Sequence, residues 1–367
     1  MVRKGRRHQD DRRQRERAGV VIEPTRKAVS RRDDIAAISG WNARIYVYLL
    51  ILLAASGTIY FWNLGRASLD DAEAYSAYIA GRPTLSAVID ANLRFDPGKP
   101  GLYPLMLHYY CRAFGTSKVA LRAFSAAFAL ASVVLVFALA ARLFDDATAL
   151  AASAIWAFNP VILVLERWAR MYSMFIALAV ASLLALRLVQ EKPTVLRTVT
   201  FGLLGAAMLY THLGAVCILG AEAALLVRDY WCGRSVFAPS LGLLITLILF
   251  APVAPLSFDQ IYSSMTGERF AWIGPAIELP LAIKAVVGLA AVSAALVLVF
   301  GPPRAFDRPD APVGANPEPL RWSAIWVVLP VIVLFAGSIL VRPMFKLRYL
   351  APMVAGIPIL VAASLNL

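Results

Sequence analysis

Three acidic side chains, Asp70, Asp71 and Glu73, lie close together in the polar stretch that follows the first long apolar segment. Carboxylates can act as general bases, and they are also preferred ligands of hard divalent cations. Because Asp71 precedes Glu73 by two residues, the two side chains point to different sides of a regular helix. They converge only if the helix begins at a turn with Asp70 or Asp71 as its N-cap. N-capping alone is the alternative role for these acids.

Basic side chains occur in two short segments, ERWARM at 166–171 and RPMFKLRY at 342–349, that are predicted to lie outside the membrane, where short loops normally avoid them. The charged residues of the two segments are Glu166, Arg167, Arg170, Arg342, Lys346 and Arg348. Arginine offers paired donors for phosphate oxygens. Cations that face the acidic run therefore predict a site for a phosphate-bearing lipid, with a divalent cation (Mg, Mn or Zn) held by Asp71 and Glu73 as an optional component. Capping of helix ends and pairing with lipid headgroups is the alternative.

Several other polar residues are weaker candidates. Tyr172 and Tyr349 closely follow Arg170 and Arg348, so each can bond the same phosphate or anchor its helix at the membrane interface. His212, at a turn between two short apolar segments, can contact a donor or a metal, or bond a backbone carbonyl. The loop at 257–272 is long enough to fold over an acceptor, or it is a plain connection. Its candidate residues are Glu268 and Arg269.

The elements that position these residues are predicted to be membrane-spanning helices. Hydrophobic residues make up 60% of the chain and charged residues 16%, whereas soluble domains carry about a quarter charged residues. The apolar stretches are long enough to cross a bilayer and do not alternate with polar residues, which predicts an all-α polytopic fold. Ten spans are predicted, at 44–62, 119–141, 148–165, 172–189, 197–210, 213–228, 237–256, 279–300, 322–341 and 350–366.

The connections between these spans set the predicted topology. Residues 63–118 form the longest polar segment after the N-terminal tail, and two amphipathic helices are expected in it, at 70–81 and 101–115. With the N-terminus inside, the segments that carry the acidic run, Arg170, His212 and Arg342 all lie on the outer side. A single long helix over 197–228, in place of two short spans, would place every later segment on the opposite side of the membrane.

The positive charge of the chain, formally +13, gathers near the N-terminus. Residues 1–43 hold twelve Lys or Arg against six Asp or Glu and contain no motif for reading bases, so nucleic acid is not the expected partner. This segment is predicted to be a disordered basic tail. By the positive-inside rule it lies in the cytoplasm.

Five blocks of the sequence, in this order, resemble the GT-C superfamily of lipid-phosphosugar glycosyltransferases. The blocks are SLDDAEAYSAYIAG, PGLYPLMLHYYCRAFGTSKVALRAFS, NPVILVLERWARMYSMFIALA, LYTHLGA and RPMFKLRYLAP, and the resemblance spans about 44–365. The nearest branch contains the protein O-mannosyltransferases and the lipid A aminoarabinose transferase. The family usually carries an adjacent Asp-Glu pair followed by Ala and an aromatic residue. Glu73, Ala74 and Tyr75 match, but Ala72 occupies the usual Asp position.

The resemblance implies an enzyme whose catalytic domain is 44–367, in the inner membrane of a bacterium, with a periplasmic active site that serves the cell-envelope glycan. It also implies a polyprenyl-phosphate-linked sugar as donor and a hydroxyl of a lipid, glycan or protein as acceptor. On this hypothesis Asp71 is the base, Asp70 and Glu73 position it or hold a metal, and the basic residues bind the donor phosphate.

A transporter or flippase without chemistry is the competing interpretation. Transporters tend to place ionisable groups near the middle of the bilayer, often in two repeated halves. The predicted spans are nearly free of charge, with Glu222 and Lys284 as the main exceptions, and no internal repeat is evident. The sequence therefore favours the enzyme.

Overall fold

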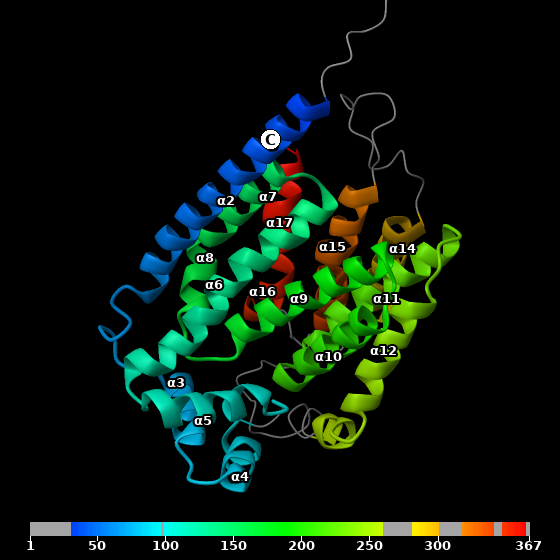
Figure 1. Cartoon of the computed structure of the whole chain (residues 1–367). Helices are drawn as coiled ribbons and strands as arrows, with labels where there is room; N and C mark the ends of the chain where they lie inside the picture. Colours follow the sequence, from blue (N-terminus) through cyan, green and yellow to red (C-terminus); the bar gives the residue numbers. More distant parts are fainter. Residues whose placement is uncertain (1–30, 97–98, 260–280, 301–317, 341–346, 365–367) are drawn as a thin grey trace, which may run out of the picture. The chain divides into compact units, whose positions relative to one another are not determined.

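The structure, a computed structural model, describes residues 31–96, 99–259, 281–300, 318–340 and 347–364. Within these residues every regular element is a helix, which confirms the all-α fold (Figure 1). The chain divides into two units, Met1–Val47 and Tyr48–Leu367. The helices are α2 (Arg31–Phe61), α3 (Asp71–Ala80), α4 (Leu85–Phe95), α5 (Leu102–Phe114), α6 (Lys118–Leu143), α7 (Asp146–Ala157), α8 (Pro160–Glu166), α9 (Tyr172–Glu191), α10 (Val195–Thr211), α11 (Ala215–Trp231), α12 (Phe237–Phe250), α14 (Leu281–Phe300), α15 (Glu318–Leu340), α16 (Leu347–Val354) and α17 (Gly356–Ser364).

Four helical stretches of the described residues are long and apolar enough to cross a membrane: Ala43–Phe61, Lys118–Leu143, Tyr172–Glu191 and Glu318–Leu340. Three shorter apolar stretches accompany them, in α10, in α12 and at Pro352–Ser364. The chain is thus a multi-pass membrane protein, but the predicted count of ten spans is not confirmed. In the second unit α6 packs against α7 and α9, α9 against α10, and α15 against α11, α14 and α17.

Two predicted spans are broken, so their boundaries were wrong. The span expected at 148–165 is divided into α7 and α8, because Pro160 lacks a backbone N–H and disfavours a helical conformation at Asn159. The span expected at 350–366 is divided into α16 and α17 around Ala355. Gly356, the first residue of α17, lies so close to Val327 and Trp326 of α15 that a Cβ atom would clash with them.

The first helix begins at Arg31, well before the predicted start of the first span at residue 44. Residues 31–43, which were predicted as part of the disordered tail, belong to this helix. Extending a formed helix adds one hydrogen bond for each residue fixed, with no new nucleation cost. The rest of the predicted tail, residues 1–30, lies outside the described residues.

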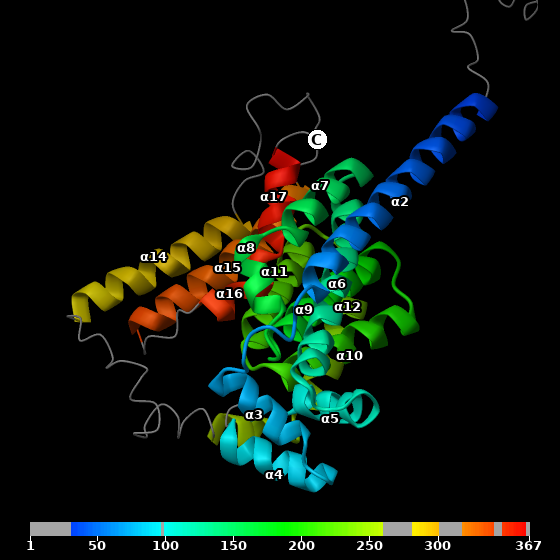
Figure 2. The same ribbon diagram turned by 90° about the vertical axis from the view of Figure 1, so that its left-hand side faces the viewer.

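Three short helices occupy the predicted outer loop, where two were expected. Helices α3 and α5 confirm the predictions at 70–81 and 101–115, and α4, which Thr84 caps, was missed. Gly101 precedes α5 with φ of 101°, a conformation that other residues rarely adopt. Figures 1 and 2 both show α3, α4 and α5 gathered beyond one end of the helix bundle.

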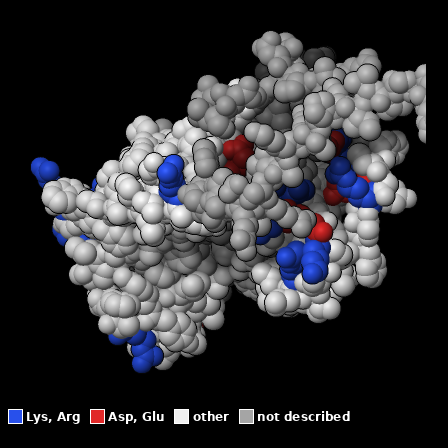
Figure 3. All heavy atoms as spheres, turned by 45° about the horizontal axis from the view of Figure 1, so that its top comes forward, with Lys and Arg blue, Asp and Glu red and all other residues white. Residues whose placement is uncertain are grey.

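The predicted inner connections meet at the other end of the bundle. Arg142 at the end of α6 donates to Glu191 at the end of α9, and Gln190 donates to Asp229 of α11. Arg228 of α11 forms an ion pair with Glu318, the first residue of α15. Figure 3 shows Lys and Arg side chains beside Asp and Glu side chains on one side of the molecule.

Helices α10 and α11 are separate, as the two-span interpretation requires. Helix α10 ends at Thr211, and α11 begins at Ala215 after a turn in which Gly214 N–H donates to His212 Nδ1. Residues from the predicted outer segments, Thr211 and Met171 among them, line one pocket with the first-loop helices. The described connections are therefore sorted to two ends, as predicted.

Candidate active site

The acidic run forms the N-terminus of α3. Asp70 is the N-cap, and its Oδ1 accepts from the backbone N–H of Glu73 at 2.8 Å. The Glu73 side chain accepts from the backbone N–H of Asp70 at 3.2 Å, which completes a capping box. The turn that the sequence required for these acids is therefore present.

Glu73 is buried in an ion pair with Arg122, a residue that the sequence analysis did not select. Arg122 Nε and one terminal nitrogen donate to the two oxygens of Glu73 at 2.8 and 2.6 Å. The same guanidinium donates to the carbonyls of Leu64, Ala67 and Ser68. Arg122 thus ties the segment before α3 to the first turns of α6.

The environment of Glu73 keeps it ionised. Burial by itself would raise the pKa of Glu73. Hydrogen bonds from Arg122 and from the backbone N–H groups of Ala169 and Asp70 outweigh this effect and lower the pKa below its usual value. Glu73 therefore serves as a fixed anion at the base of α3, with both oxygens occupied.

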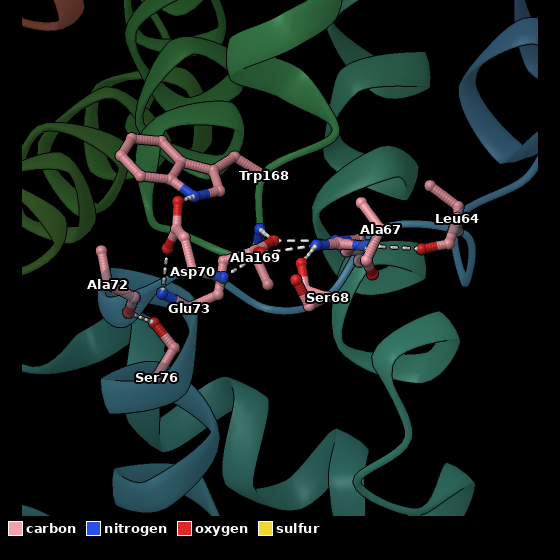
Figure 4. Close-up of polar contacts among 10 residues, drawn as sticks. Leu64, Ala67, Ser68, Asp70, Ala72, Glu73, Ser76, Trp168 and Ala169 are labelled. Atoms are coloured by element: carbon pink, nitrogen blue, oxygen red, sulfur yellow. Dashed lines mark hydrogen bonds and ion pairs between the residues drawn. The ribbon is translucent and has the colours of Figure 1, made fainter.

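Two consecutive residues after α8 contact the acidic run from across the chain. Trp168 Nε1 donates to Asp70 Oδ2 at 2.6 Å, and the backbone N–H of Ala169 donates to Glu73 Oε1 at 2.9 Å. Figure 4 shows Asp70 held between Trp168 and the start of α3. Both oxygens of Asp70 are consequently occupied as well.

Asp71 differs from its two acidic neighbours. Its side chain is exposed, and within the described part of the chain its carboxylate accepts no hydrogen bond and forms no ion pair. It lies in the first turn of α3, where the partial positive charge of the helix N-terminus stabilises an anion. Among these three acids, Asp71 is the one whose oxygens are available to a substrate.

Arg170 meets the same helix, as its predicted role requires. It donates to the carbonyl of Ala72 at 3.2 Å and to Ser76 Oγ at 3.3 Å, and it forms an ion pair with Asp96 at 2.8 Å. Lys99 bonds Asp96 at 2.9 Å. Burial raises the pKa of Asp96, but Lys99 and Arg170 together lower it below its usual value.

A small pocket opens beside this ion-paired group. Its lining residues are Ser76, Ile79, Asn92, Asp96, Lys99, Tyr103, Pro104, Met171 and Thr211. They come from α3, α4, α5 and the outer ends of α9 and α10. The helices of the loop after the first span and the start of α9 therefore line one cavity.

An aromatic stack extends the site toward α10. Trp168 stacks on Tyr172 with ring centroids 5.6 Å apart, and Tyr172 is buried. His212 is also buried and stacks on Phe175 at 5.0 Å, with Tyr172 at 6.1 Å. Tyr172 and His212 thus lie beside Trp168 in the wall of the site.

The remaining predicted site residues are not placed. Residues 342 and 346 and the loop at 260–280 lie outside the described residues, and so do the side chains of several residues in described helices. The predictions concerned are Arg342, Lys346, Arg348, Tyr349, Glu166, Glu268 and Arg269.

The described residues do not form the metal site that was expected at Asp71 and Glu73. Arg122 and two backbone N–H groups occupy the oxygens of Glu73, so it is not arranged to share a cation with Asp71. Among the described residues no group of three His, Cys, Asp or Glu side chains could hold a metal ion. No step proposed below uses one.

The sequence contained signals for some of the residues that were missed. Arg122 lies one turn inside a predicted span, where an unpaired charge is costly, so its position indicated a buried partner. Asp96 and Lys99 flank a Pro-Gly pair in the sequence, and nothing local indicated that Asp96 pairs with Arg170.

Comparisons with known proteins bear on the fold of the chain. Residues 98–255 match the family model described as dolichyl-phosphate-mannose-protein mannosyltransferase. No curated protein sequence matches the chain closely enough to count as a relative.

Two solved structures resemble the fold. ArnT from Cupriavidus metallidurans bound to undecaprenyl phosphate is 15% identical with a TM-score of 0.52, over 89% of this chain and 60% of that one. The Archaeoglobus fulgidus oligosaccharyltransferase, solved with Zn and sulfate, is 14% identical with a TM-score of 0.52, over 87% and 49%. The chain thus spans about half to three fifths of these proteins. With the family match over 98–255, they confirm the resemblance stated from the sequence: the chain has the fold of the GT-C glycosyltransferases.

Proposed function

We propose that the chain is a membrane glycosyltransferase that moves a sugar from a polyprenyl-phosphate donor to a hydroxyl group of a lipid, glycan or protein. One observation carries this proposal: Asp71, with an exposed carboxylate, begins the helix that also lines a pocket with Lys99 and Asp96, and Asp96 forms an ion pair with Arg170. The printed description of the matched family and the lipid phosphate bound to ArnT support the same donor class.

The donor phosphate is proposed to bind in this pocket. Lys99 and Arg170 share one carboxylate, Asp96, so the group keeps a net positive charge. Arg170 Nε is buried and has no hydrogen-bond partner among the described residues. Arg342, Lys346, Arg348, Tyr172 and Tyr349 stay proposed contributors to phosphate binding.

The proposed reaction is a single inverting displacement. The acceptor hydroxyl oxygen attacks the anomeric carbon while Asp71 takes the hydroxyl proton. The bond between the anomeric carbon and the phosphate oxygen breaks, and its electron pair leaves with the polyprenyl phosphate. Lys99 and Arg170 stabilise the charge that gathers on this phosphate. Asp70 and Glu73 position the helix that carries Asp71.

The proposed site faces the periplasm of a bacterial inner membrane, with the basic N-terminal segment, residues 1–43, in the cytoplasm. The exposed start of α3 and the pocket lie at one end of the bundle, and the ion-paired connections lie at the other. A soluble acceptor can reach only the end of the helix bundle that faces its own compartment. The orientation then follows from the positive-inside rule.

The proposal is tested with the purified chain in lipid nanodiscs and a panel of polyprenyl-phosphate donors labelled in the sugar. We expect label to appear on an added hydroxyl acceptor, together with free polyprenyl phosphate in equal amount. The parallel measurement, in proteoliposomes, is movement of the intact labelled donor between leaflets. Movement without label transfer from any donor would support the transporter and overturn the enzyme.

A further inference from the structure

The exposed face of α3 carries a second feature, which begins at Asp71. Asp71, Tyr75 and Tyr78 recur at helical spacing and therefore share one face. The opposite face, with Glu73, Ser76 and Ile79, is buried. A helix of a folded loop usually presents polar side chains outward. Here two tyrosine rings are 47% and 44% exposed.

Helix α4 adds a third ring to this face. Phe95 lies nearly parallel to Tyr75, with ring centroids 6.4 Å apart, and edge-on to Tyr78 at 5.0 Å. Phe95 itself is 37% exposed. The three rings thus form one partly exposed aromatic surface, called the aromatic face below. Ile79, Val88, Ala91 and Leu105 pack beneath it and hold α3, α4 and α5 together.

Charged groups border the aromatic face. The Arg82 guanidinium lies over the Tyr78 ring at 3.6 Å and is anchored by a bond from its Nε to the Tyr78 carbonyl. The Arg94 guanidinium lies 5.6 Å from the centre of the Phe95 ring. Asp71 marks the N-terminal end of the same face. Flat apolar rings thus alternate with hydrogen-bonding groups of both signs.

This combination suits a saccharide better than an acyl chain or an extended peptide. A pyranose ring has an apolar C–H face that packs on an aromatic ring and a rim of hydroxyl groups that bond charged side chains. An acyl chain would gain nothing from Asp71, Arg82 or Arg94. A peptide would need unpaired backbone groups or apolar pockets, and the surface offers exposed rings instead.

We propose that the aromatic face binds a saccharide acceptor, with sugar rings packed on Tyr75 and its neighbours and the attacking hydroxyl directed to Asp71. This inference rests on the proposed function and deepens it, because it selects a glycan from the three acceptor classes. The aromatic face and the phosphate pocket meet at the C-terminal end of α4, where Phe95 and Asp96 are adjacent in sequence.

The experiment measures binding without turnover. Saturation-transfer NMR is recorded for the full chain in nanodiscs, without donor, with mannan, arabinan and β-glucan hexasaccharides as probes. We expect at least one probe to bind, and Tyr75→Ala to weaken its binding about 3- to 10-fold, which corresponds to a ring contact of about 0.7–1.4 kcal/mol. Tyr75→Phe keeps the ring and should stay within about twofold of the original protein.

Tyr230→Ala is the matched control, because Tyr230 is an exposed tyrosine at the other end of the bundle. This variant should bind the probe like the original protein. The inference is overturned if none of the probes binds or if Tyr75→Ala binds as well as the original protein. A second measurement places an NMR label at position 78 and compares its line broadening by a lipid with a spin-labelled headgroup and by a soluble relaxation agent. Stronger broadening by the lipid would also overturn the inference, since the rings would then be a membrane-interface belt.

Failure of this inference is distinguishable from failure of the proposed function. Sugar transfer to aliphatic alcohols without saccharide binding would contradict the role of the aromatic face as an acceptor site and would support the proposed enzyme activity. Saccharide binding that depends on Tyr75, without transfer from any donor, would support the aromatic face as a saccharide site and would contradict the proposed enzyme activity.

Discussion

At the residue scale, the site depends on the difference between three adjacent acids. The oxygens of Asp70 accept hydrogen bonds from the backbone N–H of Glu73 and from Trp168. Those of Glu73 accept from Ala169 and Arg122. Asp71 makes no such bond within the described chain. The bonds of Asp70 and Glu73 therefore fix the start of the helix, and the carboxylate of Asp71 is left available for its proposed role as base.

The first prediction concerns the ion pair of Arg122 and Glu73. Arg122→Ala should lower the free energy of unfolding by about 3–5 kcal/mol, because it leaves a buried carboxylate unpaired. Thermal unfolding in detergent measures the loss. Arg142→Ala is the control: it breaks a partly exposed pair with Glu191, which is worth about 1 kcal/mol or less. Equal losses for the two variants would contradict the role given to Arg122.

A second prediction follows from the lowered pKa of Glu73. The folded-state value lies below the usual 4.5, so the ionised pair contributes stability above pH 4.5 and loses it as pH falls through the lower folded value. The melting temperature should therefore fall as the pH is lowered below about 4.5. Glu73→Gln should be less stable at pH 7 and should lose less on acidification. If the melting temperature of Glu73→Gln falls with pH as much as that of the original chain, a group other than Glu73 causes the loss of stability in acid.

At the element scale, local signals predicted some helices, and others depended on contacts from elsewhere in the chain. Asp70 and Gly101 marked the starts of α3 and α5 in the sequence. Thr84 marked α4 equally well and was overlooked. The break after α7 was missed because Pro160 lies within a continuous apolar run, and the break after α16 was missed because the run continues through Ala355. The pairing of Arg170 with Asp96 joins residues from different loops, so no local pattern could reveal it.

The packing of α10 against α12 gives the third prediction. A Cβ on Gly205 would clash with Thr246, whereas a Cβ on exposed Gly220 of α11 would meet nothing. Gly220→Ala should therefore stabilise its helix by about 0.5–1 kcal/mol, and Gly205→Ala should destabilise the bundle by about 1–3 kcal/mol. Thermal unfolding of both variants checks the signs. Two stabilising alanines would mean that α10 and α12 are not closely packed.

At the scale of the whole molecule, the contacts sort the described connections to two ends, and the proposed site occupies one of them. The sequence predicted this sorting from the parity of its spans, although two span boundaries were wrong. It succeeded because α10 and α11 are separate helices, as the turn at His212 indicated. Which end faces the cytoplasm stays a proposal, and accessibility can test it.

The fourth prediction is the labelling of cysteines in intact bacterial cells by a membrane-impermeant maleimide. Cys232 is exposed at the end opposite the first loop, and Asp90 is an exposed residue of α4. With Cys111 and Cys217 replaced by alanine, an introduced Asp90→Cys should be labelled in cells whose outer membrane has been permeabilised. Cys232 should be labelled only after the inner membrane is opened. The reverse pattern would place the proposed site in the cytoplasm.

The central claim is that Asp71 performs chemistry in a site that binds the donor through other residues. The direct measurement compares Asp71→Asn with the original chain and with Asp90→Asn, an exposed acid in the same loop, for sugar transfer from the active donor and for binding of polyprenyl phosphate. We predict that Asp71→Asn lowers turnover by about 10²- to 10⁴-fold while binding stays within about twofold, and that Asp90→Asn changes neither. Near-normal turnover by Asp71→Asn would contradict the account.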